Sequence, residues 1–448
     1  MKNILKEKFD LTANSKIIVV GEGITGTSVA KFLESLALPF SIVDSRKAAF
    51  TFETFKGATH LIVSPGVALS EPTIADALNS GTKLISDIDL FAAVVNVPIV
   101  GITGANGKST VTTMLGDMAR TCGKNVGVGG NLGKPALDLL DDTAELYVLE
   151  LSSFQLERSH VLNAAAATVL NISADHLDRH DDLENYAKAK QAIFSGDGVM
   201  ILNSDDEMVS AMFNSTRKTI TFSIKQKADF YLANHNLMHG ENVLMSLADL
   251  PLEGKHNAAN ALAALALGTA IGLDSVLCVT ALKNFKALNH RMQKVSTKNG
   301  INWVNDSKAT NIGACIAALE GYDEKVILIA GGEGKGQDMN ELAPVIFAKA
   351  KAVILIGKDA PQIETAIEMM CEAIATTSFN LLPNRQLRNE IVPAYHAQDM
   401  QEVVAIASHI GKSGDTVLLS PACASLDQYK NYQDRGNQFA AAIEALPA

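Results

Sequence analysis

The sequence predicts an α/β protein built from three successive α/β domains. Short apolar runs typical of buried strands alternate with helical patterns along the chain, which indicates β–α–β units and parallel sheets. Two of these runs lead into glycine-rich loops, at residues 21–26 and 101–107. The 448 residues, of which 47% are apolar, can form several packed cores. A wholly disordered chain is excluded, because such chains lack the apolar surface that offsets the entropy of ordering.

The first segment begins with the run KIIVV at residues 16–20, followed by a glycine-rich turn and a helical pattern over residues 27–36. The runs FSIVD, HLIVSPG and KLISD predict further strands that end in turns. A new segment starts at PIVGITG, because this strand leads directly into the second glycine-rich loop. We place the first boundary in a connector near residues 91–97 and predict domains at residues 1–93, 94–288 and 289–448.

The middle segment contains YVLELSS and AATVLNIS as buried strands and a long helix around residues 186–194. Its last predicted element is the alanine-rich helix after Asn257. The third segment repeats the alternation, with strands at KVILIAGG, AVILIG and DTVLLSP and a final helix that ends near Leu446.

Charge and cysteine content limit the function classes. The chain has 38 Lys and Arg against 49 Asp and Glu, a formal net charge of −11, so it is poorly suited to bind nucleic acid. The five scattered cysteines include no CxxC pair, and we expect free thiols in a reducing compartment. Polar residues interrupt the apolar stretch 258–273, and residues 1–16 lack an apolar signal core. We therefore expect a cytoplasmic protein with no membrane partner.

The strongest local pattern is PIVGITGANGKSTVTTML, in which Lys108 and Ser109 open an apolar-periodic helix. Glycines let backbone N–H groups and the helix N-terminus surround phosphates. Lys108 would neutralise phosphate oxygens, and the Ser109 hydroxyl would be a Mg²⁺ ligand. The match to GxxxxGK[ST] is imperfect, because Ile102 stands five positions before Gly107. An ordinary strand–turn–helix is the alternative, but an ATP-type phosphate site explains the pattern better.

The first glycine-rich turn, GEGITG, follows the first predicted strand, and Asp44 closes the second. This pattern is typical of a dinucleotide site in which Asp44 would bind a ribose, so a nicotinamide cofactor is one interpretation. The same turn could bind any diphosphate. DSR at residues 44–46 and SPG at residues 64–66 also stand at expected carboxyl ends of strands, where open α/β sheets bind ligands. A plain turn is the alternative for residues 64–66.

Three residues of the middle segment are candidates for binding cations. Glu150 ends an apolar strand, where a buried carboxylate is costly unless it is paired or binds a cation such as Mg²⁺. His176 follows the next strand and should lie beside Glu150 and the phosphate loop, although a lone histidine is more often structural. Lys190 alone resembles a solvated helix lysine. Near a metal it could react with CO₂ and become a metal-binding carbamate, although its spacing does not demand this.

Three loops of the last segment carry polar residues after predicted strands: NDSKATN, GGEGKG and SPACASLDQYKNY. Each could be a surface loop. Because the three follow strands of one predicted sheet, we expect them to share a ligand crevice.

The motifs TGANGKST, GGNLGKP, LELSSFQLE, DHLDRH, HNAAN, HRM, NDSKATN, GGEGKG and SPACASLDQYKNYQDRG together resemble the Mur ligases, in order and over essentially the whole chain. The resemblance implies a Rossmann-like N-terminal domain for a UDP substrate, a central P-loop domain for ATP, and a Rossmann-like C-terminal domain for an amino acid. Within the family, GEGITG, DSR, SPG and the tail pattern indicate the ATP-dependent addition of D-glutamate to UDP-N-acetylmuramoyl-L-alanine through an acyl phosphate. The resemblance thus implies a monomeric enzyme of bacterial peptidoglycan synthesis, needed for cell shape and division, with only small-molecule partners.

The resemblance also implies residue roles, taken motif by motif. The residues expected at the UDP substrate are Ile24, Thr25, Ser45, Arg46, Ser64, Pro65, Gly66, Gly130 and Asn131. Those expected at ATP are Gly104, Asn106, Gly107, Lys108, Ser109, Thr110, Asn260, Arg291, Asp306 and Lys308. Those expected at D-glutamate are Thr310, Lys335, Ser425, Leu426 and Tyr432. Those expected at two Mg²⁺ ions are Ser109, Glu150, His176 and Lys190 as its carbamate, and the catalytic set is Lys108, Glu150, His176 and Lys190.

Two positions depart from the family pattern, because Glu333 stands where Asp is usual and Tyr432 stands where Phe is usual. Two other function classes stay open. A nicotinamide-dependent oxidoreductase would leave the Lys108 loop unexplained, and a non-catalytic nucleotide switch would leave Glu150 without a role. Within the family, the alternatives are a member that adds another amino acid and a folate polyglutamylating relative.

Overall fold

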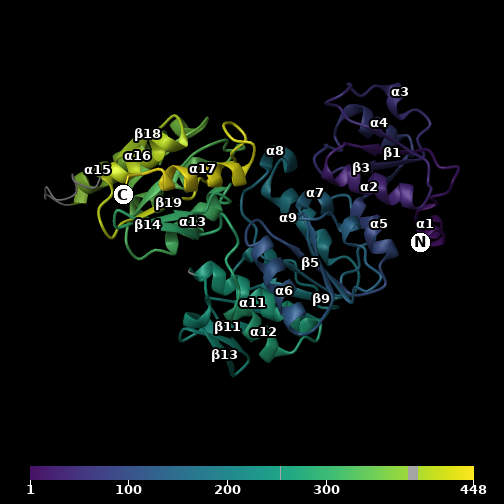
Figure 1. The fold of residues 1–448 in the computed structure, drawn as a ribbon, viewed down its shortest axis with the longest axis horizontal. Coiled ribbons are helices and arrows are strands. Elements are labelled where there is room, and N and C mark those ends of the chain that lie inside the picture. Colours follow the sequence, from purple (N-terminus) through teal and green to yellow (C-terminus); the bar gives the residue numbers. More distant parts are fainter. Residues whose placement is uncertain (253, 382–391, 448) are drawn as a thin grey trace. The chain divides into compact units, whose positions relative to one another are not determined.

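The computed structural model describes residues 1–252, 254–381 and 392–447, and its described strands form three sheets (Figure 1). Most strand pairs are parallel, which confirms the predicted α/β class. The chain divides into two compact units. The first comprises Met1–Ile172, Asp182–Leu250 and Ala258–Phe285, and the second comprises Ser173–Asp181, Pro251–Asn257 and Lys286–Ala448. In the described ranges, no helix has the length and apolar character needed to cross a bilayer.

The N-terminal sheet belongs to the first unit and has the strand order β2-β1-β3-β4, with all pairs parallel. Its strands are β1 (Ile17–Val20), β2 (Phe40–Val43), β3 (His60–Val63) and β4 (Lys83–Ile85). The accompanying helices are α1 (Lys2–Phe9), α2 (Ile24–Ser35), α3 (Phe52–Phe55), α4 (Pro72–Asn79) and α5 (Asp87–Val94). Alternate side chains of β1 face opposite layers, so Val19 packs with α2 and Ile18 packs with α4.

The central sheet also belongs to the first unit and has the order β13-β12-β11-β10-β9-β8-β5-β7-β6. The strands are β5 (Ile99–Thr103), β6 (Val126–Gly130), β7 (Leu146–Glu150), β8 (Ala166–Val169), β9 (Val199–Asn203), β10 (Thr219–Ser223), β11 (Phe230–Ala233), β12 (Asn236–His239) and β13 (Asn242–Ser246). The helical elements between and after them are α6 (Lys108–Thr121), η1 (Ala136–Leu139), α7 (Ser153–Leu156), α8 (Leu177–His180), α9 (Leu183–Gln191), η2 (Ala192–Phe194), α10 (Glu207–Ser210), η3 (Leu247–Asp249), α11 (Lys255–Ala270) and α12 (Ser275–Lys283). Because β5 lies between β7 and β8, all its residues are buried.

Two expectations about this region were wrong. The connector predicted near residues 91–97 begins inside α5, where Phe91 is fully buried in a core shared by the first two sheets. The alanine-rich helix α11 is followed by α12 and is not the last element before the third segment. The prediction also omitted β6 and β9 to β13. The antiparallel edge strand β13 is mostly exposed or half-buried, so it lacks the continuous apolar run that marks β5.

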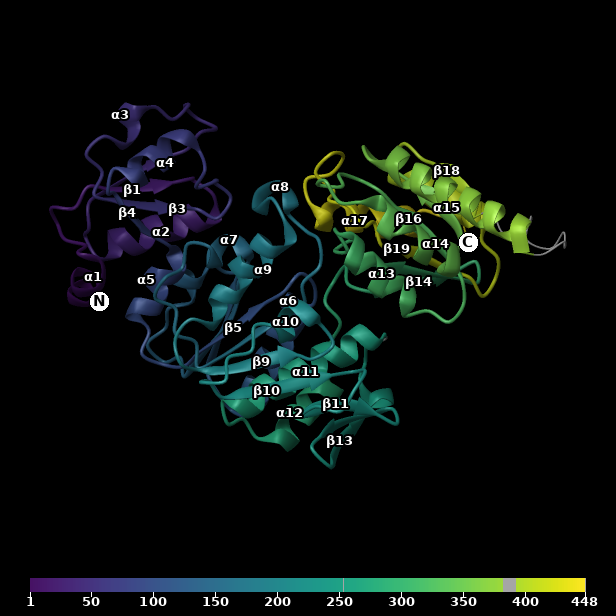
Figure 2. The same ribbon diagram turned by 180° about the vertical axis from the view of Figure 1, so that it is seen from behind.

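The third sheet belongs to the second unit and has the order β14-β15-β19-β16-β17-β18, in which only β14 is antiparallel to its neighbour. Its strands are β14 (Gln293–Lys298), β15 (Ile301–Asn305), β16 (Val326–Ala330), β17 (Ala350–Leu355), β18 (Ala394–His396) and β19 (Thr416–Leu419). Its helical elements are α13 (Ile312–Glu320), η4 (Met339–Glu341), α14 (Ala343–Lys349), α15 (Ala360–Leu381), α16 (Met400–Ile410) and α17 (Tyr432–Glu444). Helices α13 to α15 pack on one face and α16 and α17 on the other (Figure 2).

Candidate functional site

The loop between β5 and α6 has the backbone shape that a phosphate site requires. Gly107 precedes α6 with φ 83°, and a side-chain carbon there would lie 2.3 Å from Asn260 Oδ1, so only glycine fits. Asn260 therefore lies against the phosphate loop. Ser109 and Thr110 stand in the first turn of α6, whose N–H groups and dipole favour an anion.

Two side chains fix the conformation of this loop. Lys108 Nζ donates to the carbonyl oxygens of Gly104 and Ala105, each at 2.7 Å, so its charge lies over the loop. Asn171, which follows β8, accepts a hydrogen bond from Asn106 N at 2.8 Å and donates one to Asn106 O at 3.2 Å. Sequence reasoning missed Asn171, although its position after a strand next to β5 was a usable signal.

Glu150 lies at the carboxyl end of β7, in register with Ile102 of β5. Its side chain is 3% exposed, and Oε1 accepts a hydrogen bond from Asn131 Nδ2 at 2.6 Å. Within the described part of the chain, Oε2 is buried without a hydrogen-bond partner. A side-chain carbon on Gly130 would lie 2.4 Å from Glu150 O, so the predicted substrate residues Gly130 and Asn131 contact this glutamate. An unpartnered buried carboxylate oxygen fits a bound cation.

Lys190 also lies against the phosphate loop. Its side chain on α9 is 1% exposed, and Nζ donates to Gly104 O at 2.9 Å and to Thr103 Oγ1 at 3.4 Å. The Nζ atom also lies 4.4 Å from the centre of the Tyr186 ring. The interpretation of Lys190 as a solvated helix lysine was therefore wrong, because tertiary packing buries it beside the loop.

No three His, Cys, Asp or Glu side chains in the described ranges gather around one point. A cation at Glu150 would therefore need other oxygen ligands, as Mg²⁺ does when it takes one carboxylate, a hydroxyl such as that of Ser109, and substrate phosphates. His176 begins α8 with φ 57°, and its Nε2 lies 3.7 Å from Asp175 Oδ2 within the second unit. The expected pairing of His176 with Lys190 stays a prediction.

The GEGITG turn is organised by Asp44. This carboxylate accepts hydrogen bonds from Glu22 N at 2.8 Å and from Arg46 Nε and Nη2 at 2.9 and 2.6 Å. These bonds, with that of Arg46 first, hold the pKa of Asp44 well below its ordinary value. Because Asp44 already binds the chain through both oxygens, it is less suited to the ribose of a nicotinamide cofactor. Ile24, by contrast, is 76% exposed at the start of α2, where its apolar side chain is free to contact a ligand.

The loops after β15, β16 and β19 converge in the second unit, because these strands are parallel neighbours. The Arg435 side chain, 1% exposed, joins all three loops. It donates to Ser307 O at 2.9 Å, Cys423 O at 3.1 Å and Gly331 O at 3.5 Å. The three polar loops therefore lie at one edge of the sheet, and the expectation that they share a ligand crevice stays a prediction.

Asp306 lies at this edge, directly after β15. Its Oδ1 accepts from Met292 N at 3.2 Å, and its Oδ2 accepts from Ser420 Oγ at 3.1 Å. Burial raises the pKa of Asp306 to about 7, although these hydrogen bonds and the charge of Arg291 oppose the rise.

Two lysines of the second unit carry its positive charge near these loops. Lys308 Nζ lies 4.1 Å from the centre of the Tyr432 ring, and Lys335 Nζ lies 3.2 Å from Asp175 Oδ1. Asn311 Nδ2 donates to the other Asp175 oxygen at 3.2 Å. Asp175 was not identified as a site residue from the sequence. No local pattern indicates that it contacts Asn311 and Lys335, which lie far from it in the sequence.

The other residues expected at the amino acid lie on the same loops. Thr310 N donates to Lys308 O at 2.8 Å, so Thr310 follows the lysine in a tight turn. Ser425 is buried at 3% exposure, and the adjacent Leu426 is 67% exposed.

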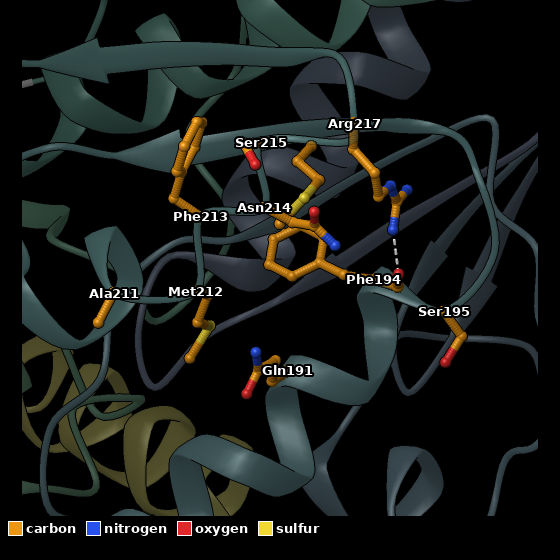
Figure 3. A pocket seen from close by; sticks show the side chains of 10 residues that line it. Gln191, Phe194, Ser195, Ala211, Met212, Phe213, Asn214, Ser215 and Arg217 are labelled. Atoms are coloured by element: carbon orange, nitrogen blue, oxygen red, sulfur yellow. Dashed lines mark hydrogen bonds between the residues drawn. The ribbon is translucent and has the colours of Figure 1, made fainter.

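Figure 3 shows the side chains that line a cavity of about 430 Å³ in the first unit. Its lining includes Phe194, Met200 and Arg217, and Arg217 Nη1 donates to Phe194 O. Met200 is near the amino end of β9, whereas the phosphate loop follows the carboxyl end of β5, and these strands run parallel through β8. The predicted site residues do not line this cavity.

Comparisons with known proteins agree with the α/β fold and with the family that the loop motifs resemble. A model described as the Mur ligase middle domain matches residues 102–268, and one described as Mur ligase, glutamate ligase domain matches residues 290–423. A UDP-N-acetylmuramoylalanine--D-glutamate ligase from Methylococcus capsulatus is 44% identical over 464 residues, covering 98% of this chain and 96% of that protein. A protein of the same name from Nitrosococcus oceani is 41% identical and covers 99% of both chains.

Solved structures share the fold at low identity. The UDP-N-acetylmuramate-alanine ligase MurC from Thermotoga maritima has a TM-score of 0.60 at 17% identity, covering 96% of this chain and 100% of that one. A pseudomurein peptide ligase type C from Methanothermus fervidus has a TM-score of 0.58 at 18% identity, covering 91% of this chain and 96% of that one.

Proposed function

This chain belongs to the Mur ligase family, and we propose that it joins D-glutamate to UDP-N-acetylmuramoyl-L-alanine with cleavage of ATP to ADP and phosphate. Relatives that carry this activity in their names match nearly the full chain at 40–44% identity, which supports this member of the family. The observation that carries the chemistry is the buried, unpartnered Glu150 oxygen on the strand beside the Lys108 loop.

The first proposed step activates the substrate. A carboxylate resists attack by an amine, so the γ-phosphoryl group of ATP is transferred to the L-alanyl carboxylate, which gives an acyl phosphate and ADP. Lys108 acts here by neutralising the negative charge that develops on the phosphoryl oxygens. Its present contacts with Gly104 and Ala105 place the ammonium group over the loop that would surround these oxygens.

Two cation sites are part of the proposal. Mg²⁺, when bound, would supply positive charge to the phosphoryl oxygens. Ser109 and Glu150 fit one such ion, because a hydroxyl and a carboxylate are ligands that Mg²⁺ prefers. His176 and the carbamate of Lys190 are proposed for the other, and the burial of Lys190 beside the phosphate loop supports this assignment.

The second proposed step forms the amide. The neutral amine of D-glutamate attacks the acyl carbon, the C–O bond to phosphate breaks, and the nitrogen loses a proton. The D-glutamate carboxylates require cationic and polar partners, which Lys335, Thr310 and Ser425 would supply from one edge of the third sheet. Water must be excluded while the acyl phosphate exists, and we propose that ligand binding brings the domains together for this purpose.

A phosphate-release assay tests the function. Purified protein should release phosphate from ATP only when both UDP-N-acetylmuramoyl-L-alanine and D-glutamate are present. Release with another amino acid would indicate a sibling activity, and release with a folate and L-glutamate would indicate a polyglutamylating relative. Absence of release with any acceptor would reject a ligase of this type.

A further inference from the structure

Arg158, a buried arginine that follows α7, connects the two sheets of the first unit. Its side chain is 0% exposed and stands on the connection that follows Glu150, the last residue of β7. Its Nη1 donates to Val63 O at 3.0 Å and Ser64 O at 2.9 Å, and its Nη2 donates to Val67 O at 3.4 Å. One guanidinium group of the central segment therefore binds three carbonyls of the turn that follows β3.

This turn is itself bonded to the first glycine-rich turn. Ser64 Oγ donates to Gly21 O at 3.2 Å, while Ser64 O accepts from Arg158. A side-chain carbon on Gly26 would lie 1.8 Å from Gly21 O and 3.2 Å from Ser64 Oγ, so the two turns pack without space between them. A shift of the Ser64 carbonyl would therefore move both turns that are expected to bind the UDP substrate.

The Glu157 carboxylate compensates the charge of Arg158. Glu157 Oε1 lies 2.5 Å from Arg158 Nη2. Asp87, 3% exposed at the start of α5, has its pKa raised by burial to about 6, and the charge of Arg158 opposes this rise. Burying an uncompensated guanidinium is costly, so this arrangement indicates a group built to bind main-chain carbonyls inside the protein.

We propose that Arg158 is a positioning residue for the nucleotide-sugar substrate, because it holds the turn of residues 63–67 in register with Glu150 and the phosphate loop. The inference rests on the proposed function. The UDP group and the reacting carboxylate are opposite ends of one molecule, so the loops that bind them must keep a fixed separation. Arg158 sets that separation through the connection that follows Glu150, and it touches none of the reacting atoms.

The test compares the Michaelis constants of three substrates in four variants. Arg158→Met removes the donors at similar volume, and Arg158→Met with Glu157→Gln also removes the carboxylate that would be left without its ion pair. Both should raise KM for UDP-N-acetylmuramoyl-L-alanine by about tenfold or more and change KM for ATP and D-glutamate by less than about threefold. Arg158→Lys should restore part of the loss, because an ammonium group keeps the charge but cannot span three carbonyls.

Ser28→Ala is the matched control. It removes the 2.6 Å hydrogen bond from Ser28 Oγ to Asp138 Oδ1, which also joins the N-terminal and central sheets but does not reach the Ser64 turn. It should leave all three Michaelis constants unchanged. Calorimetric binding of UDP-N-acetylmuramoyl-L-alanine without ATP should show the same order of affinities as the kinetic measurements.

The outcomes separate the two proposals. An unmutated chain that releases no phosphate with both acceptors would overturn the proposed function and this inference with it. An active unmutated chain whose charge-compensated double variant keeps the normal KM for the UDP substrate would overturn the inference alone. Equal changes in all three Michaelis constants would also overturn it, because they would indicate a general structural role.

Discussion

Each of the two units contains a buried arginine that binds main-chain carbonyls. The two arginines connect different parts of the structure. Arg435 lies in the second unit and joins loops that follow three adjacent strands of one sheet. Arg158 lies in the first unit and joins its own connection in the central sheet to a turn of the N-terminal sheet. Arg435 therefore stabilises the edge of a single sheet, whereas Arg158 fixes one sheet relative to another.

The electrostatic surroundings of the two arginines also differ. Arg158 contacts the Glu157 carboxylate directly, whereas the oxygens within hydrogen-bond distance of Arg435 are carbonyls and the Ser307 hydroxyl. Burial lowers the pKa of Arg435 to about 10. Similar buried arginines thus stabilise one sheet edge in the second unit and, as proposed, hold the substrate-binding turns in the first.

The largest expected effect distinguishes the proposed role of the first unit, phosphoryl transfer, from the proposed role of the second unit, binding of D-glutamate. Lys108→Ala should lower kcat by about 1,000-fold, because it removes the positive charge that stabilises the transferring phosphoryl group. Lys335→Ala should act mainly on KM for D-glutamate. Steady-state phosphate release measures both. Lys124→Ala is the control, since Lys124 forms a half-exposed ion pair with Glu145 after α6, and its kcat should be unchanged. A near-normal kcat for Lys108→Ala would refute its assigned role.

The next largest effect is a loss of stability of the second unit, and it tests whether Arg435 has the structural role described above. Arg435→Met should destabilise the second unit by about 3 kcal/mol, because several buried carbonyls lose their donor. Urea unfolding followed by tryptophan fluorescence reports on this unit, since the only tryptophan, Trp303, is buried in β15. Lys358→Met, which removes an exposed ion pair with Glu333 in the same unit, should change stability by less than about 0.5 kcal/mol. Equal unfolding midpoints for the two variants would contradict this account.

A smaller effect is the pH dependence of stability, which should have opposite signs for Asp306 in the second unit and Asp44 in the first. The pKa of Asp306 rises from 3.8 to about 7 on folding, so the folded state binds the extra proton between these values. Its contribution to stability is present below about pH 4 and is lost as the pH rises through 7. Asp306→Asn should flatten this part of the Trp303 unfolding profile.

Asp44 of the first unit should behave in the opposite way. Folding lowers its pKa, so its contribution is present at neutral pH and is lost on acidification below the ordinary value of 3.8. Asp44→Asn should weaken the acid sensitivity of the first unit in amide hydrogen exchange. An unchanged pH profile in either variant would show that the corresponding carboxylate does not control it.

The smallest expected effect is at a position that departs from the family pattern. Glu333→Asp should change KM for D-glutamate by less than about twofold, because Glu333 holds its loop through backbone bonds to Ala424, with N–O distances of 2.9 Å in both directions. Its side chain is partly exposed and lies 3.5 Å from Lys358. A tenfold change would show that the side-chain length itself selects the substrate.

The sequence predicted most of the strands that are buried on both faces, although it missed β9, which is mostly buried. Strands such as β5, β7 and β16 are continuous apolar runs, because helices or neighbouring elements cover both sides of a parallel sheet. The edge strands β13 and β14 were missed, because they are exposed or half-buried and carry mixed residues.

Local sequence patterns also explain which site residues were found. Lys108 and Glu150 were recognisable because local patterns, a glycine loop and a charge ending an apolar strand, mark them. Arg158 and Asp175 carry no such mark. Arg158 binds carbonyls some ninety residues earlier in the chain, and Asp175 binds Lys335 about 160 residues later, so only the folded structure reveals either role.

The most direct test of the central claim follows one oxygen atom. UDP-N-acetylmuramoyl-L-alanine labelled with ¹⁸O in its L-alanyl carboxylate is incubated with ATP, D-glutamate and the protein, and the released phosphate is analysed by mass spectrometry. Activation as an acyl phosphate predicts one ¹⁸O atom in each phosphate, because the bond that breaks on amine attack joins carbon to the carboxylate oxygen. Amide formation accompanied by unlabelled phosphate would contradict the account.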